Sequence, residues 1–300
     1  MAFDIINYLR AKRELVDRAL DTLLPDGGES QARLLESMRY SVLAGGKRLR
    51  PILALAAGEA VGADPEKVMP AACAIEMIHT YSLIHDDLPS MDDDALRRGI
   101  PTNHRVFGES TAILAGDALL SDAFGMLVAE GLRRGVSARM ICEIVSDIAE
   151  AAGSRGMTEG QAMDLALTLA GTKDVTLPQV ERMHALKTGA MIRVSVTAGA
   201  RIGGADENQL EKLASYADAV GLAYQIIDDI LDIEGEGDLG KERGNDERHG
   251  KSTYPGLAGI EESKRKASEL TRKAVGILEG FDHRAEALRQ IALYLGCRNH

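Results

Sequence analysis

Long stretches of the 300-residue chain repeat apolar residues at helical spacing, and this periodicity narrows the fold to one class. The stretches are rich in Ala, Leu, Ile and Met, whereas strand-like alternation and the Asn-Gly turns typical of hairpins are scarce. Glycine and proline divide the sequence into pieces of ordinary helix length, for example at 45–46, 99–101 and 203–204. We therefore predict an all-α protein with roughly ten to twelve helices.

The composition fits a folded protein that does not bind nucleic acid. Hydrophobic residues make up 45% of the chain and charged residues 27%, which is enough to bury a sizeable core. The formal net charge of −11 argues against nonspecific nucleic-acid binding, because such binding depends on basic patches. No shift in composition marks a linker and no internal repeat is apparent, so residues 1–300 are interpreted as one domain.

Targeting segments and disulfides are not expected. No uninterrupted apolar run reaches the roughly 18 residues that a membrane span needs. The first residues, Met1 to Asp4, lack a basic region followed by an apolar stretch. The three cysteines, Cys73, Cys142 and Cys297, are odd in number and have no Cys-x-x-Cys spacing, which favours reduced thiols over a disulfide framework or a zinc site. Together these features predict a cytoplasmic protein.

One helical segment, 219–232, carries polar residues along a single face. A stripe of alanine, leucine and isoleucine marks its other side. The polar face holds four residues at i, i+3, i+4 and i+7: Gln225, Asp228, Asp229 and Asp232. A solvated acidic face is the usual explanation of such a pattern, but the flanking Ile-Ile and Ile-Leu pairs indicate a helix inside the fold. Carboxylates gathered in this way suit Mg²⁺, whose coordination is completed by water and substrate phosphate.

A second group of carboxylates follows an apolar helical run that leads to Pro89. Asp86 and Asp92 are six residues apart, which on an unbroken helix would place them about 120° out of phase. Because Pro89 cannot continue the helical hydrogen bonds, we expect the chain to loop there and return Asp92 toward Asp86. Arg97 and Arg98 follow, and their guanidinium groups are suited to bidentate contacts with phosphate.

A basic loop, Gly45 to Arg50, directly precedes Pro51. Proline suits the first turn of a helix, so the loop is predicted to lie at a helix N-terminus. Free N–H groups and the helix dipole favour an anion at such a position. The polar segment 235–250 is predicted to be a loop that a ligand orders, although a plain solvated connection fits it equally well.

Taken together, these motifs resemble those of the trans-prenyl diphosphate synthases. The segment Tyr81–Gly99 is similar to the first aspartate-rich motif of the bacterial enzymes, Asp-Asp-x₄-Asp, and 228–232 is similar to the second, Asp-Asp-x-x-Asp. Shorter signatures follow in the family's order: Gly46–Pro51, Gly160-Gln161 with Asp164, Lys187–Gly189, Gly240-Lys241 and Gly250–Pro255. Ala95 stands where many relatives carry a further acid, and we expect little effect because it follows Asp92.

The resemblance implies a large helical bundle of the isoprenoid synthase type with a central catalytic cavity. It also implies condensation of isopentenyl diphosphate with dimethylallyl or geranyl diphosphate, release of pyrophosphate, and three Mg²⁺ ions against the leaving group. Asp86 and Asp92 would take two ions and Asp228 the third. The carboxylates implied as further ligands or as their support are Asp87, Asp229 and Asp232. A homodimer packed through helices is implied as well, although the sequence identifies no interface.

The two diphosphates are expected to bind different sets of side chains. The residues implied around the allylic diphosphate are Arg97, Lys187, Gln225, Lys241 and Lys251, with Thr188 near the reacting centre. Those implied around isopentenyl diphosphate, whose site should be basic and free of metal, are Lys47, Arg50, His79 and Arg98. No general base is required, because the released pyrophosphate can accept the proton.

Product length is expected to depend on the helix that precedes Asp86. Tyr81 and Ser82 stand five and four residues before it, so Tyr81 lies about 7.5 Å along the helix axis. One aromatic residue at this depth, with the two-residue insertion around Pro89, resembles the bacterial farnesyl diphosphate synthases. Ordinary core packing explains Tyr81 equally well, and a geranylgeranyl diphosphate synthase is the main alternative.

Three other classes fit the sequence less well. An all-α metal-dependent phosphohydrolase that used His85 and Asp86 would need further histidines at matching helical positions, and His79, His104 and His184 do not supply them. A noncatalytic subunit of the same fold would be expected to lose an aspartate motif, and both are intact. Terpene cyclases usually carry an Asn/Ser/Glu metal set in place of the second motif.

Overall fold

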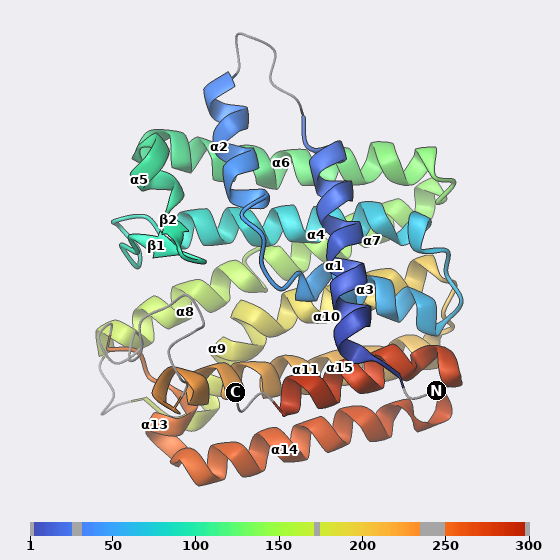
Figure 1. Ribbon diagram of the computed structural model, residues 1–300. Helices are drawn as coiled ribbons and strands as arrows, with labels where there is room; N and C mark the ends of the chain where they lie inside the picture. Colours follow the sequence, from blue (N-terminus) through green and yellow to red (C-terminus); the bar gives the residue numbers. More distant parts are fainter. Residues whose placement is uncertain (1–2, 26–31, 171–174, 235–249, 298–300) are drawn as a thin grey trace.

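The computed structural model describes residues 3–25, 32–170, 175–234 and 250–297, and they form a bundle of α-helices (Figure 1). The predicted all-α class is confirmed. In the described part of the chain, the strands are limited to a small antiparallel hairpin of β1 (Leu96–Arg97) and β2 (Ile100–Pro101). The helices before this hairpin are α1 (Ile5–Leu23), α2 (Ala32–Val42), α3 (Leu49–Ala60) and α4 (Pro65–Asp86).

The remaining helices follow the hairpin in chain order. They are α5 (Asn103–Phe107), α6 (Glu109–Arg133), α7 (Ala138–Ala152), α8 (Met157–Ala170), α9 (Leu177–His184), the π-helical turn η1 (Ala185–Gly189), α10 (Ala190–Ile202), α11 (Glu207–Glu234), α13 (Tyr254–Ala258), α14 (Ile260–Ile277) and α15 (Glu286–Gly296). Two short 3₁₀ turns, η2 (Leu278–Gly280) and η3 (His283–Ala285), connect α14 to α15.

The long helices lie side by side, from α6 and α4 through α3 and α10 to α11 and α14, while α1 and α2 cross them steeply (Figure 1). Helices α3, α4 and α10 form the centre, and α4 is buried on all sides over most of its length. A glycine permits the tightest contact between α3 and α10: a Cβ on Gly199 would lie 1.9 Å from the carbonyl oxygen of Ala54. The buried residues of α4 extend to Ile84, so the core holds this helix to within two residues of its end at Asp86.

Helix α6 is long and apolar enough to cross a membrane, as judged by length and composition alone. Its most apolar window has a mean hydropathy of 1.6, and a third of that window is buried. The sequence-based expectation differed because Asp117 and Asp122 interrupt every continuous apolar run in this helix. Core helices of water-soluble proteins have the same properties, and α6 packs along α4.

Two local predictions from proline are borne out by the backbone. Pro51 lies in the first turn of α3, as predicted, but the helix already begins at Leu49, so Gly45 to Arg48 precede it and Arg50 belongs to its first turn. Helix α4 ends at Asp86, and beyond Pro89 the N–H of Asp92 donates to the carbonyl oxygen of Asp86 over 2.9 Å. The chain therefore folds back as the sequence predicted, and the two aspartates are brought together by a backbone hydrogen bond.

Candidate active site

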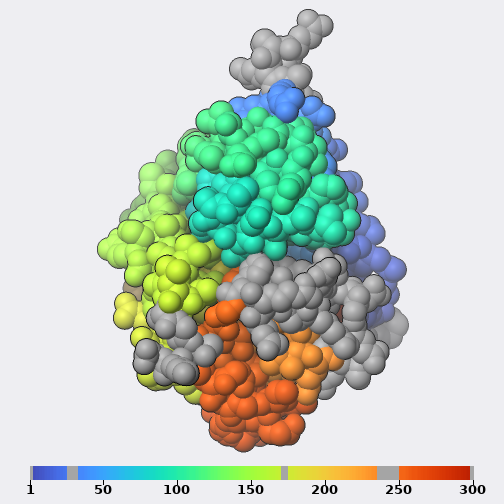
Figure 2. Space-filling view, turned by 90° about the vertical axis from the view of Figure 1, so that its left-hand side faces the viewer, coloured from blue at the N-terminus to red at the C-terminus, as the bar shows by residue number. Residues whose placement is uncertain are grey.

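A cavity of about 1040 Å³ opens among the described elements toward the end of the bundle where the β-hairpin, α8 and α13 lie. Figure 2 shows the molecule from that end. The cavity wall is built from the C-terminal half of α4, from α8, from η1, from α11 and from the loops before α3 and α13. The predicted residues that border it are Lys47, Arg50, His79, Tyr81, Ser82, Asp86, Asp92, Arg97, Arg98, Lys187, Thr188, Gln225, Asp228, Asp229, Asp232 and Lys251.

Two of the predicted residues differ from this group. Lys241 lies outside the described residues. Asp87 is only 3% exposed and is not among the residues that border the cavity. Its carboxylate is instead bound by Arg97, whose Nε lies 2.6 Å from Oδ1 and 2.9 Å from Oδ2. Nη2 of Arg97 lies 2.5 Å from Oδ1 of the same carboxylate. This position fits the supporting role among the two that the resemblance left open, because the contact through two nitrogens holds Arg97 at the cavity.

Asp86 and Asp92 form one acidic wall. Burial raises the pKa of Asp86 to about 6; the nearby Lys187 ammonium opposes this rise, and the charge of Asp92 adds to it. Asp92 also accepts a 3.3 Å contact from Nζ of Lys251. The loop before α13 therefore reaches the first aspartate motif, although the two are far apart in the sequence.

Asp228, Asp229 and Asp232 on α11 form the second acidic wall, with Gln225 on the same face. Asp229 is 6% exposed and accepts a 2.8 Å hydrogen bond from the backbone N–H of Tyr254, the first residue of α13. Nε2 of His184 lies 3.7 Å from the same carboxylate. Because burial lowers the pKa of His184 to about 4, the imidazole is neutral at neutral pH. Asp229 thus ties α13 to the second motif.

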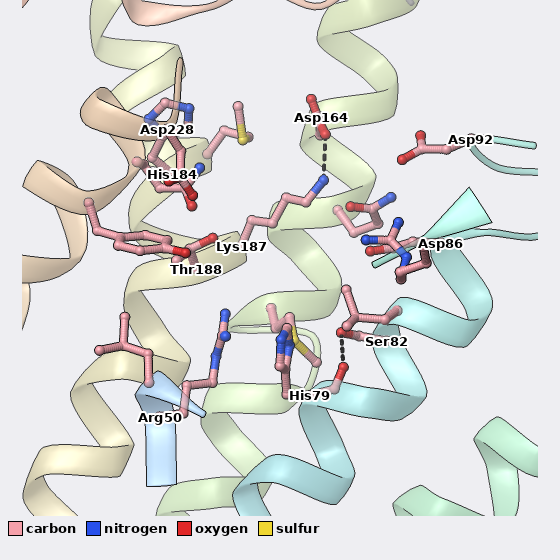
Figure 3. A pocket seen from close by; sticks show the side chains of 18 of the residues that line it. Arg50, His79, Ser82, Asp86, Asp92, Asp164, His184, Lys187, Thr188 and Asp228 are labelled. Carbon is pink, nitrogen blue, oxygen red and sulfur yellow. Dashed lines mark hydrogen bonds and ion pairs between the residues drawn. The ribbon is translucent and has the colours of Figure 1, made fainter. Parts of the chain in front are cut away.

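Lys187 projects from η1 between the two acidic walls, as Figure 3 shows. Its Nζ lies 2.6 Å from Oδ2 of Asp164 on α8, which is 7% exposed. A glycine on α8 makes this possible: a Cβ on Gly160 would lie 2.2 Å from the backbone nitrogen of Lys187. Gly160 therefore allows η1 to pack closely against α8, and Asp164 binds the side chain of Lys187.

The cationic side of the cavity contains Arg50 and His79, which Figure 3 shows on the side away from Asp164. Burial, together with the charges of Arg50 and Arg98, holds the pKa of His79 well below its usual value. His79 is therefore a neutral hydrogen-bonding group. Arg98 donates through Nη1 to the carbonyl oxygen of Gly45, in the loop before α3.

Tyr81 and Ser82 line the cavity one to two helical turns before Asp86. The Tyr81 ring meets the His85 ring edge-on, with 5.8 Å between centroids. Oγ of Ser82 donates to the carbonyl oxygen of His79 over 2.8 Å, so this hydroxyl is engaged within α4. Met157 and Thr158 of α8 border the same cavity. The Tyr81 ring is thus one of the bulky α4 groups that border the cavity near Asp86, together with Leu83 and His85.

The donor set fits Mg²⁺. The candidate ligands are carboxylates, the oxygen donors that this ion prefers. Within the described residues, no three His, Cys, Asp or Glu side chains already converge as a metal-binding group. In proteins Mg²⁺ is commonly held by a few carboxylates and completed by water and substrate phosphate.

Known proteins match the chain over nearly its whole length. The polyprenyl synthetase family profile matches residues 31–292. The chain is 46% identical over 303 residues to geranylgeranyl pyrophosphate synthase 11 of Arabidopsis thaliana, covering 100% of this chain and 84% of that protein. It is 45% identical over 302 residues to the geranylgeranyl pyrophosphate synthase of Catharanthus roseus, covering 100% and 83%.

Solved structures agree with these relatives in fold. An FPP/GFPP synthase from Zymomonas mobilis superposes with a TM-score of 0.87 at 37% identity, over 98% of this chain and 100% of that one. A putative farnesyl-diphosphate synthase from Marinomonas sp. MED121 gives a TM-score of 0.81 at 36% identity, over 98% and 99%.

Proposed function

The chain belongs to the polyprenyl synthetase family, whose members are trans-prenyl diphosphate synthases, and we propose that its product is farnesyl diphosphate. The proposed substrates are isopentenyl diphosphate and an allylic diphosphate, dimethylallyl or geranyl, with Mg²⁺ as cofactor. The observation that carries the farnesyl assignment is the Tyr81 ring on the cavity wall below Asp86.

The acidic walls suit the allylic diphosphate. Asp86 and Asp92 on one side and Asp228 on the other would hold the ions. Bound Mg²⁺ supplies a Lewis acid that stabilises the departing pyrophosphate. Arg97 and Lys187 reach the same space and add positive charge where negative charge develops. For Lys187 this means exchanging its bond to Asp164 for one to phosphate.

The cationic side suits the second substrate, whose C–O bond must stay intact. Arg50 and Arg98 bring fixed positive charge, and the neutral imidazole of His79 brings a hydrogen bond. Among the described residues, the candidate metal ligands lie on the acidic walls, and the carboxylate of the cationic side, Glu76, is paired with Arg48. We therefore expect that a diphosphate bound on the cationic side is not activated by metal. The two substrates are thereby sorted, and the pyrophosphate released on the acidic side can take up the proton lost in the condensation.

A geranylgeranyl diphosphate synthase is the second candidate. It is favoured by the names of the curated relatives, which are geranylgeranyl pyrophosphate synthases. The two candidates differ by one isoprene unit of cavity depth, and in the farnesyl proposal Tyr81 is the side chain on α4 that would limit this depth.

A homodimer and a cytoplasmic location complete the proposal. Helix α6 exposes four large apolar side chains, Ile113, Leu114, Val128 and Leu132, between 39% and 56%. They give the helix an apolar surface that a second copy of the chain would cover. Light scattering after gel filtration measures the mass, and a mass of one chain, about 32.2 kDa, would contradict the homodimer.

The product is identified by incubating the protein with isopentenyl diphosphate, dimethylallyl diphosphate and Mg²⁺, and separating the dephosphorylated products by chain length. We expect a fifteen-carbon product. A twenty-carbon product would replace the farnesyl assignment with the second candidate. Asp86→Ala and Asp228→Ala are each expected to abolish turnover while the circular dichroism of the helices is retained.

A further inference from the structure

The loop before α3 is held in a backbone conformation that most residues avoid. Gly45 and Gly46 have φ values of 80° and 124°, and Arg48 has a φ of 49°. Such values suit glycine but are disfavoured for a residue with a Cβ. In the described part of the chain, the other non-glycine residues with positive φ are Asp93 and Arg98. All three belong to the two loops that meet at the cavity. An unfavourable backbone conformation persists only where contacts with the surrounding structure hold it in place.

The side chain of Arg48 supplies this constraint. Arg48 is 2% exposed, and all three of its guanidinium nitrogens are bonded within the protein. Nε donates to Oδ1 of Asp17 over 2.7 Å, Nη1 to Oε1 of Glu76 over 2.8 Å, and Nη2 to the carbonyl oxygen of Val42 over 2.6 Å. These contacts join α1, α2 and α4 to the start of α3, so Arg48 is committed to the fold rather than available for a ligand.

Glu76 lies at the centre of the cationic side as a buried carboxylate. It is 1% exposed, and an ionised carboxylate in that position requires a partner, which Arg48 provides. Burial lowers the pKa of the guanidinium groups of Arg48, Arg50 and Arg98. The negative charge of Glu76 opposes this effect in all three. Glu76 is thus an internal counter-ion for guanidinium groups that would otherwise repel one another.

The residues implied in binding isopentenyl diphosphate all connect to this pair. Lys47 and Arg50 flank Arg48 in the chain, and His79 follows Glu76 by one turn on α4. The guanidinium of Arg98 packs so closely on the loop that a Cβ on Gly46 would lie 2.5 Å from its Cζ. The positions of Lys47, Arg50 and Arg98 therefore depend on where the Arg48 loop is fixed, while His79 is held by α4 beside the same pair.

We propose that Arg48, held by Glu76 and Asp17, is a positioning residue for the second substrate: it orders the cationic side for the diphosphate of isopentenyl diphosphate without touching it. This inference rests on the proposed function of the same cavity. It assigns Arg48, Glu76 and Asp17 a role in substrate selection, whereas the allylic diphosphate on the acidic side does not depend on them.

The test is Arg48→Lys, which keeps the charge but cannot reach three acceptors in different directions. If the loop shifts, Lys47 or Arg50 loses a charged hydrogen bond to the diphosphate, and one such bond is worth about tenfold in affinity. We expect the KM for isopentenyl diphosphate to rise by that factor, while the KM for geranyl diphosphate and kcat at saturation stay within about twofold. A purely structural role would instead lower the amount of active enzyme and leave the KM for isopentenyl diphosphate unchanged. The matched control is Arg193→Lys, which alters an exposed pair with Asp218 on the surface.

A second variant covers the case in which Arg48→Lys fails to fold. Asp17→Asn removes the negative charge from the partly exposed arm of the network but keeps an oxygen that can accept from Arg48. The Asp17 side chain is 39% exposed, and the Arg48–Glu76 pair stays intact. We expect a smaller rise, about threefold, in the same KM and in no other kinetic constant. An unchanged KM for isopentenyl diphosphate in both variants would overturn the inference.

Binding of inorganic pyrophosphate in the presence of EDTA separates this inference from the proposed function. Without metal, pyrophosphate should bind the cationic side, and calorimetry should show weaker binding to Arg48→Lys than to the wild type. A wild type that binds pyrophosphate but condenses nothing would refute the proposed function and leave the positioning role standing. Equal pyrophosphate affinity of wild type and variant would refute the positioning role itself.

Discussion

The acidic cavity should make the metal-free protein less stable at neutral pH, and Asp86→Asn should relieve this. Burial is the main cause that raises the pKa of Asp86 to about 6 from its usual 3.8. Between about pH 6 and about pH 4, Asp86 is therefore protonated in the folded state but still ionised in the unfolded state. Wild-type stability rises as the pH falls through this window, and the full penalty is present above pH 6.

The size of the effect follows from the two pKa values. Their difference corresponds to at most about 3 kcal/mol of unfolding free energy at pH 7.5. Because asparagine resembles the protonated acid and carries no charge, Asp86→Asn should be more stable than the wild type by up to this amount at pH 7.5. The advantage should shrink toward zero as the pH approaches 4, although the variant has lost its activity.

Urea unfolding followed by circular dichroism, in EDTA at pH 7.5 and pH 5.0, measures both numbers. Asp117→Asn, on the exposed face of α6, is the matched control for removal of one negative charge. The reasoning is wrong if Asp86→Asn is no more stable than the wild type at pH 7.5, or if its advantage is the same at both pH values.

Substitutions at three further positions probe other parts of the site. Tyr81→Ala should lengthen the product to geranylgeranyl diphosphate or beyond, and Tyr81→Phe should not; unchanged chain length in the alanine variant would remove the ring as the floor. Asp87→Asn should lower kcat/KM for the allylic substrate about 10- to 100-fold, because the charged pair with Arg97 is lost. The Mg²⁺ concentration for half-maximal activity should stay within about twofold. A large change in that concentration would make Asp87 a direct ligand. Gly160→Ala should displace Lys187, whose backbone nitrogen would lie 2.2 Å from the new Cβ, so both activity and melting temperature should fall, and an unaltered melting temperature would contradict this packing.

Local rules of chain geometry explain which features the sequence could predict. The fourfold polar pattern from Gln225 to Asp232 requires only helical phase, and all four side chains do border the cavity. The return of Asp92 to Asp86 requires only that proline cannot extend a helix. Both inferences concern residues within one helix or one loop, where covalent geometry limits the outcome.

Contacts between distant segments could not be predicted in the same way. Arg48 is bonded to Asp17 and Glu76, which lie on two other helices. Nothing in the spacing of these two acids relates them to a basic loop. The bond between Asp164 and Lys187 depends on how α8 packs against η1. The one sequence clue was the signature with Gly160 and Asp164 four residues apart, which places both on one helix face but does not identify the element they meet.

The central claim is that the cavity joins two diphosphates rather than hydrolysing one. It is tested most directly by measuring, in one reaction with labelled isopentenyl diphosphate, dimethylallyl diphosphate and Mg²⁺, both the label incorporated into product and the pyrophosphate released. The account predicts one pyrophosphate for each isopentenyl unit incorporated, a fifteen-carbon product, and neither signal when EDTA replaces Mg²⁺. Release of phosphate or pyrophosphate without incorporation of label would contradict it.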